Sequence, residues 1–212
     1  MYKNDWIHVA LLKWKHYITD AKVVVVGSTE PTAECIAQAH GARDVTTVEY
    51  NLLTYGNVSV SKIETISVAQ FNSFYNSSKE SFDLAISLSS IEHDGLGRYG
   101  DPIDPYGDMN AMRRIMSILR PGGLLMISVP IGPDVVVFNL HRRYGALRLP
   151  MLLEGWEILD KLPWDDTKLN SPANWRQTYE PIIVLRKQNT KLAEEATIGK
   201  NIEKICESAP II

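Results

Sequence analysis

The chain has 212 residues, of which 45% are hydrophobic and 22% charged, proportions that are ordinary for a folded soluble domain. Its length suits one domain of ordinary size, and its two cysteines are too few for a disulfide framework. The formal net charge of -3 gives no electrostatic footprint for nucleic acid, so nucleic acid is not an expected partner. No apolar run approaches the length of a membrane span and the N-terminus lacks a signal-peptide pattern, so the expected location is the cytoplasm.

The first fifty residues predict the start of a nucleotide-binding α/β fold. Apolar residues at three- and four-residue spacing predict an amphipathic helix within residues 1–20, packed on the sheet that follows. Residues 22–27 form a β-branched strand that a glycine ends, and Pro31 begins the next helix. Residues 44–50 form a second strand with Glu49 near its end. Strand, glycine turn, helix and strand with a terminal acid match the first half of such a fold.

The rest of the chain continues the alternation of strands and helices. Strands are predicted at 62–66, 82–88, 124–129, 156–162 and 181–187, and helices around 68–74, 109–119 and 147–153. Asp108 is the expected cap of the second of these helices. Residues 130–144 read as an irregular stretch, and residues 188–212 as a polar C-terminal tail.

The segment from 82 to 108 is the most informative part of the sequence. A continuous apolar run, typical of a strand buried on both faces, leads into a long polar loop. The loop carries Glu92, His93, Asp94, Arg98, Tyr99, Asp101, Asp104, Tyr106 and Asp108. Ligands of open α/β sheets bind outside the carboxyl ends of the strands, and structureless loops of this length are often functional. This loop is therefore the candidate site, although a solvated surface loop is the alternative interpretation.

The turn after the first strand indicates which ligand the fold could bind. It reads Gly-Ser-Thr-Glu-Pro over residues 27–31, without the G-x-G-x-x-G pattern of a dinucleotide site and without a P-loop lysine. Glu30 would repel a pyrophosphate but suits a ligand with cationic groups. S-adenosylmethionine (SAM) carries an ammonium and a sulfonium, and Glu49 has the position of an acid that binds its ribose diol. The alternative is that Glu30 only stabilises the helix dipole and that Glu49 only ends a strand.

The predicted cofactor-binding residues share a position at the ends of the first, second and fourth strands. They are Gly27, Ser28, Glu30, Glu49, Asn51 and Ser89.

Four motifs in this order resemble class I SAM-dependent methyltransferases. They are the first strand with Glu49, the segment FDL at 82–84 leading to IEH at 91–93, LRPGGL at 119–124, and EGW at 154–156 before a strand. The resemblance covers about residues 22–187. More narrowly, EHDGLGRYGDPIDPYGD at 92–108 and HRRYGALRLPMLLEGWE at 141–157 resemble an uncharacterised domain-of-unknown-function branch of that superfamily.

The resemblance implies a fold and a cofactor. The implied fold is a Rossmann-like three-layer α/β/α sandwich with a mostly parallel seven-stranded sheet and an antiparallel last strand. Residues 21–187 would form this methyltransferase-like domain, and SAM would be its cofactor. The turn at Ser28-Thr29-Glu30 departs from the G-x-G-like turn that is usual in that superfamily. This departure is expected to affect the affinity for the cofactor more than the fold.

The polar loop supplies candidate catalytic residues for methyl transfer. Transfer from a sulfonium is an in-line displacement, and a hydroxyl acceptor needs a base to take its proton. His93 is the candidate base because its unperturbed pKa lies near neutrality, and Asp94 could orient it or bind the acceptor. The residues expected to line or close the acceptor pocket are Arg98, Tyr99, Asp101, Asp104 and His141. Their polar character favours a small-molecule or glycan acceptor, although the Glu-His pair could be merely positional.

Three hypotheses follow from the sequence. The first is a SAM-dependent methyltransferase, and the second is a methyltransferase-like domain that binds a ligand or partner without turnover. The third is a metal-assisted enzyme on a polar substrate, in which loop carboxylates with His93 and His141 bind a divalent ion. No spacing motif supports a ligand set, so no metal residues are predicted. A dehydrogenase is disfavoured by Glu30, and the sequence does not indicate an oligomeric state.

Overall fold

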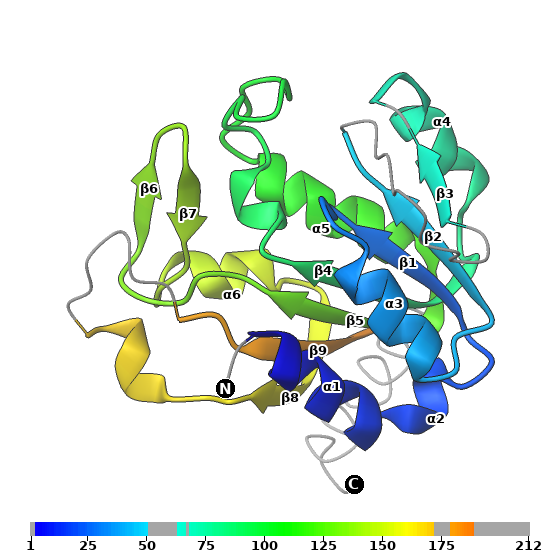
Figure 1. The fold of residues 1–212 in the computed structure, drawn as a ribbon. Helices are drawn as coiled ribbons and strands as arrows, with labels where there is room; N and C mark the ends of the chain where they lie inside the picture. The colour runs from blue at the N-terminus through cyan, green and yellow to red at the C-terminus, as the bar shows by residue number, and fades with distance from the viewer. Residues whose placement is uncertain (1–2, 51–62, 67, 172–178, 189–212) are drawn as a thin grey trace, which may run out of the picture.

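The computed structural model describes residues 3–50, 63–66, 68–171 and 179–188. Within these ranges seven strands form one sheet in the order β3-β2-β1-β4-β5-β9-β8 (Figure 1). Their bounds are β1 Lys22–Val26, β2 Asp44–Val48, β3 Ile63–Ile66, β4 Phe82–Leu88, β5 Leu119–Ser128, β8 Trp156–Leu162 and β9 Ile182–Lys187. Strand β9 is antiparallel to both its neighbours, and the pairs among β3, β2, β1, β4 and β5 are parallel. The predicted three-layer fold with an antiparallel last strand is confirmed.

Helices cover both faces of the sheet because its central strands are apolar on both sides. On one face α1 Lys3–Lys13, α2 Lys15–Ile18 and α3 Thr32–Ala39 enclose a core that includes Ile7, Val23 and Leu84. On the other face α5 Gly107–Ile118 and α6 Arg148–Leu152 enclose a core that includes Ile115 and Leu125, with α4 Val68–Ser77 beside α5. The two cores hold the sheet rigid, so the strand ends form a fixed platform for a site.

Three predicted features of the chain differ from the structure. The stretch predicted to be irregular contains a hairpin of β6 Val135–Val137 and β7 His141–Arg143, whose three-residue strands are too short to leave a periodic pattern. Helix α5 begins at Gly107 with Tyr106 as its N-cap, so Asp108 is not the cap. Strand β5 begins at Leu119 rather than 124, because the chain re-enters the sheet directly after α5 with an irregularity in its register.

The hairpin and the loop after β4 stand together at the end of the sheet where the parallel strands finish (Figure 1). The loop begins with the short 3-10 helix η1 Ile91–His93, and β7 packs against it. In the part of the chain that the structure describes, no helix combines the length and apolar character needed to cross a bilayer.

Candidate functional site

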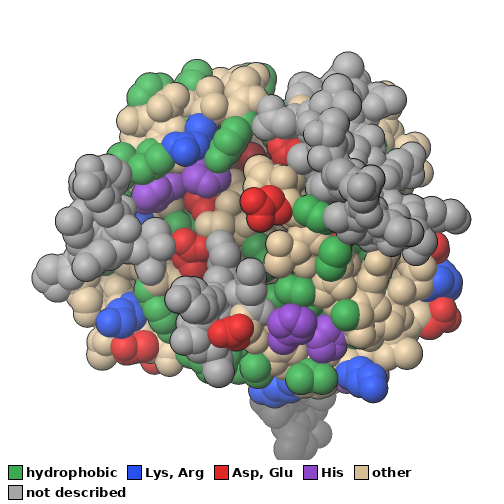
Figure 2. Space-filling model, viewed as in Figure 1, with side chains coloured by type: hydrophobic (Ala, Val, Ile, Leu, Met, Phe, Trp, Pro, Cys, Tyr) green, Lys and Arg blue, Asp and Glu red, His purple; other side chains and the backbone are tan. Residues whose placement is uncertain are grey.

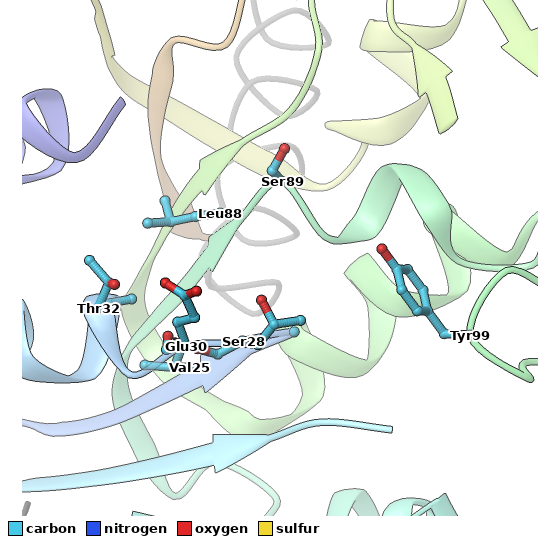
Figure 3. A pocket seen from close by; sticks show the side chains of 10 residues that line it. Val25, Ser28, Glu30, Thr32, Leu88, Ser89 and Tyr99 are labelled. Carbon is cyan, nitrogen blue, oxygen red and sulfur yellow. Dashed lines mark hydrogen bonds between the residues drawn. The ribbon is translucent and has the colours of Figure 1, made fainter. Parts of the chain in front are cut away.

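A cavity of about 300 Å³ lies at the carboxyl ends of β1 and β4, beside the first turn of α3 (Figure 3). It is lined by Val25, Gly27, Ser28, Thr29, Glu30, Thr32, Ala33, Leu88, Ser89 and Tyr99. Tyr99 reaches it from the loop after β4, on the side opposite α3. The cavity thus brings together four of the predicted cofactor-binding residues and one residue predicted for the acceptor pocket. Its place is where open α/β sheets bind ligands.

Gly27 brings the first turn into close contact with the loop after β4. Its φ is +73°, and a Cβ built on it would lie 1.7 Å from the hydroxyl oxygen of Ser90. Its N–H donates a hydrogen bond to the carbonyl of Val48 at 2.9 Å, so the turn is also tied to the end of β2. Only glycine meets both the backbone and the space requirement here.

Ser28 faces inward, beneath the turn. Its hydroxyl lies 2.7 Å from the carbonyl oxygen of Glu30 and 3.1 Å from a carboxylate oxygen of Glu34. The hydroxyl of Thr47 donates to the other oxygen of Glu34 at 2.7 Å. Sequence reasoning missed Glu34, although an acid beside the inward-facing positions of a predicted helix was a signal that could have identified it.

The structure describes one of the two remaining cofactor candidates. Glu49 follows the end of β2, one strand away from the turn, and is 7% exposed. It is not among the residues that line the cavity. Asn51 falls outside the described residues.

His93 is held by the β6–β7 hairpin. Its Nδ1 hydrogen-bonds to the carbonyl oxygen of Leu140, which can only accept, so Nδ1 carries the proton and the neutral ring has its lone pair on Nε2. Nε2 lies 3.6 Å from Oε1 of Glu92, and the ring meets the ring of Tyr99 edge-on at 5.5 Å. Burial is the main cause that lowers the pKa of His93. Leu140, and not Asp94, therefore orients this imidazole.

Ser89 links His93's surroundings to the cavity. Its hydroxyl oxygen lies 2.9 Å from Oε1 of Glu92 and 2.8 Å from Oε2 of Glu180, just before β9. Ser89 therefore joins the loop after β4 to the segment just before β9 at the cavity wall. Glu180 was not among the predicted residues because it precedes a strand far along the chain.

Asp101 and Arg98, two other predicted catalytic residues, both contact the segment that carries Tyr99. Asp101 is buried, and its carboxylate accepts hydrogen bonds from the backbone N–H groups of Gly95, Gly97 and Tyr99 at 2.7 to 3.2 Å. It therefore shapes the loop that presents Tyr99. Arg98 is exposed, with its guanidinium 5.5 Å from the centre of the Tyr99 ring.

Two titratable groups near the site have altered acidity. Burial, followed by the charge of Asp101, raises the pKa of Asp94 to about 7. His141 on β7 is 8% exposed, and burial lowers its pKa. Its Nε2 has no hydrogen-bond partner within the described part of the chain. Asp94 therefore changes charge near neutral pH, whereas His141 is neutral there.

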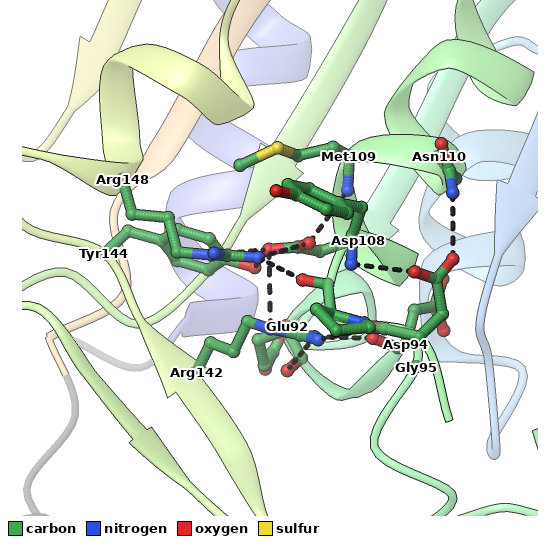
Figure 4. Close-up of polar contacts among 12 residues, drawn as sticks. Glu92, Asp94, Gly95, Asp108, Met109, Asn110, Arg142, Tyr144 and Arg148 are labelled. Atoms are coloured by element: carbon green, nitrogen blue, oxygen red, sulfur yellow. Dashed lines mark hydrogen bonds and ion pairs between the residues drawn. The ribbon is translucent and has the colours of Figure 1, made fainter. Parts of the chain in front are cut away.

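Asp108 is the centre of a buried ionic network that holds the polar loop in place (Figure 4). Arg148 binds its carboxylate with two hydrogen bonds, of 2.8 and 3.1 Å, and the hydroxyl of Tyr144 donates to it at 3.0 Å. Arg142 lies 3.7 Å from the same carboxylate and donates to the backbone carbonyls of Asp94 and Asp104. The network thus joins the loop to β7 and α6. These partners were not predicted because they are distant in sequence.

On the face of the molecule that Figure 2 shows, histidine side chains lie in two separate groups, with acidic side chains between and around them. Across the described residues, no three His, Cys, Asp or Glu side chains are grouped so that they could hold a metal ion.

Comparison of the sequence with known families identifies its family. Residues 20–187 match the family described as Caenorhabditis protein of unknown function, DUF268. The chain belongs to the DUF268 family. No curated protein matches it.

Solved structures similar to this DUF268 protein include methyltransferases, a cyclase and a putative hemolysin of Streptococcus thermophilus. The 1,6-didemethyltoxoflavin-N1-methyltransferase of Burkholderia thailandensis, with bound 1,6-didemethyltoxoflavin and S-adenosylhomocysteine, has a TM-score of 0.64 at 18% identity, over 88% of this chain and 79% of that one. A SAM-dependent methyltransferase of Mesorhizobium loti has a TM-score of 0.56 at 15% identity, over 86% of this chain and 97% of that one. The cyclase SpnF has a TM-score of 0.59 at 15% identity, over 87% and 80%. The DUF268 protein therefore has the methyltransferase fold.

Proposed function

We propose that this protein is a SAM-dependent methyltransferase that acts on a polar small-molecule or glycan acceptor. The observation that carries the proposal is the cavity at the carboxyl ends of β1 and β4, in a fold that solved methyltransferases share. Its wall combines a glycine turn, the carboxylate of Glu30 and the hydroxyls of Ser89 and Tyr99. Such a wall suits a ligand that is polar and carries positive charge.

The donor set fits SAM better than a dinucleotide. Glu30 would face the ammonium and sulfonium, and Gly27 allows close approach of the backbone. Glu49 does not line the cavity, so it would bind the ribose diol where the cofactor extends past the cavity toward the end of β2. When bound there, SAM supplies an electrophilic methyl group. A pyrophosphate in the same place would be repelled by Glu30.

His93 is the proposed base for the acceptor. Because its pKa is lowered from 6.5 and Nδ1 is bound to Leu140, the ring is neutral at physiological pH with its lone pair on Nε2. Nε2 would take the proton of an acceptor hydroxyl, and Tyr99 and Arg98 would bind the acceptor's polar groups. Turnover should therefore fall at acidic pH through a pKa below 6.5.

Calorimetric titration with SAM and S-adenosylhomocysteine tests the cofactor. We expect a micromolar Kd for each ligand, which corresponds to roughly -8 kcal/mol. Glu49→Gln and Glu30→Gln should each weaken the affinity about tenfold or more. Glu154→Gln removes an exposed acid after α6 and serves as the control, with affinity unchanged. No heat from the folded protein at millimolar ligand would contradict the proposal.

Turnover is then tested by following S-adenosylhomocysteine release from SAM with a panel of sugars and other hydroxyl compounds. The expected result is acceptor-dependent release that His93→Gln abolishes while affinity for S-adenosylhomocysteine is retained.

A second candidate is a methyltransferase-like domain that binds SAM without turnover. The turn lacks the G-x-G-like pattern, and the inward-facing hydroxyl of Ser28 is engaged by Glu30 and Glu34. SpnF is a cyclase on the same fold, so the fold alone does not define the reaction. Cofactor binding without product for any acceptor in the panel would favour this candidate.

A further inference from the structure

Glu34 is a carboxylate that lies entirely inside the protein, directly beneath the turn at 27–30. It is 0% exposed. One oxygen accepts a hydrogen bond from Thr47 on β2 at 2.7 Å, and the other lies 3.1 Å from the hydroxyl of Ser28 in the turn. Within the described residues it forms no ion pair with Lys or Arg.

Stability alone does not explain a carboxylate at this position. Among the described residues the partners of this buried carboxyl group are two hydroxyls, and a well-packed apolar side chain is often as stable or more stable in such a place. What Glu34 adds is geometry, because it connects three elements. Ser28 belongs to the turn, Glu34 to α3 and Thr47 to β2.

The same contacts fix the part of the turn that faces the cavity. Ser28 also contacts the carbonyl oxygen of Glu30 at 2.7 Å, so its hydroxyl connects both ends of the turn to Glu34. The carboxylate of Glu30 lines the cavity directly above this contact. Through Thr47 the turn is anchored to β2, the strand that leads to Glu49.

We infer that Glu34 is a positioning residue, which holds the turn in the shape that binds the cationic end of the cofactor. It does so in a turn where the superfamily's glycine pattern is replaced by Ser28-Thr29-Glu30. The inference rests on the proposed function for its ligand, but the effect on the turn itself is independent of any ligand.

The test separates positioning from stability. The double variant Glu34→Leu/Thr47→Val replaces the buried acid and its threonine partner with apolar side chains, and Ser28 keeps its hydrogen bond to the carbonyl of Glu30, so no buried polar group is left unsatisfied. Thr46→Val is the matched control, because Thr46 is the neighbouring buried threonine and points to the other face of β2. Each protein is examined by urea unfolding, by calorimetry with S-adenosylhomocysteine and by amide hydrogen exchange at residues 27–30.

We expect the double variant to remain folded, to bind S-adenosylhomocysteine at least about tenfold more weakly than the parent, and to exchange its turn amides faster. The control should match the parent in affinity and exchange. Affinity within about twofold of the parent, together with unchanged exchange at the turn, would overturn the inference.

Two further outcomes are decided by the same measurements. If the parent binds no S-adenosylhomocysteine, the proposed function fails, and the exchange comparison alone confirms or refutes the effect of Glu34 on the turn. If the double variant does not fold, Thr47→Val, which removes one hydroxyl at constant volume, provides the same comparison against Thr46→Val.

Discussion

Gly27 shows how one residue without a side chain sets the distance between two loops. We expect Gly27→Ala to lower the free energy of unfolding by about 2–4 kcal/mol, because alanine is strained at φ +73° and its Cβ would overlap Ser90. Gly122 is the matched control, with φ +76° and nothing within 4 Å of a built Cβ. Gly122→Ala should cost only about 1 kcal/mol, from backbone strain alone. Urea unfolding checks both, and equal losses would refute the close contact at Gly27.

Asp94 makes stability depend on pH near neutrality. Its folded pKa of about 7 lies above the ordinary value of 3.8, so the folded state holds a proton that the unfolded chain has already released. That contribution is present at acidic pH and is lost as pH rises from about 4 through 7, with an upper limit of roughly 4 kcal/mol. Asp94→Asn stays neutral at every pH, so it should be more stable than the parent at pH 8.

Urea unfolding at pH 5 and pH 8 measures this difference. Asp104→Asn is the control, because hydrogen bonds lower the pKa of Asp104 and it stays ionised over this range. Between pH 5 and pH 8 the free energy of unfolding of Asp104→Asn should fall as much as that of the parent. The free energy of unfolding of Asp94→Asn should change much less over the same range. An identical pH dependence in Asp94→Asn and the parent would show that Asp94 titrates normally.

The elements themselves were largely predictable from sequence, because each strand or helix leaves a local pattern. The apolar run of β4 and the β-branched run of β1 are found where expected, since burial on both faces requires apolar residues throughout. The β6–β7 hairpin was not predicted, because its strands are three residues long and its role comes from Leu140's backbone carbonyl, which has no sequence signal.

The contacts between elements were harder to predict. Asp108 looked like a helix cap from its place before an apolar helix pattern, but its partners Tyr144 and Arg148 lie some 40 residues away. Such pairs form only when β7 and α6 fold back on α5, so local sequence does not reveal them.

Asp108→Asn tests how strongly this network holds α5, β7 and α6 together. Removing a buried partner leaves the charges of Arg148 and Arg142 uncompensated, so we expect a loss of about 3–5 kcal/mol in the free energy of unfolding. Glu157→Gln breaks an exposed ion pair with Arg186 and should cost far less. In urea unfolding, similar losses for the two variants would mean that the network contributes little.

At the scale of the whole molecule, strand order is what local patterns cannot supply. Local signals predicted the strands, and the resemblance to methyltransferases implied a mostly parallel sheet with an antiparallel last strand, but the order β3-β2-β1-β4-β5-β9-β8 is known only from the structure. This order places the ends of β1 and β4 side by side, so the turn after one strand and the loop after the other share one cavity. A ligand bound there contacts elements that come together only in the folded chain.

Ligand-dependent thermal stability therefore tests the site as a property of the whole fold. S-adenosylhomocysteine at about one hundred times its Kd should stabilise the folded state by about 2.7 kcal/mol, which raises the Tm by roughly 5–10 °C for a chain of this size. NAD at the same concentration should give no shift, because Glu30 repels its pyrophosphate. Differential scanning calorimetry distinguishes the two ligands. A shift with NAD but none with S-adenosylhomocysteine would mean that the cavity binds dinucleotides in spite of Glu30, and that the electrostatic argument for a cationic ligand is wrong.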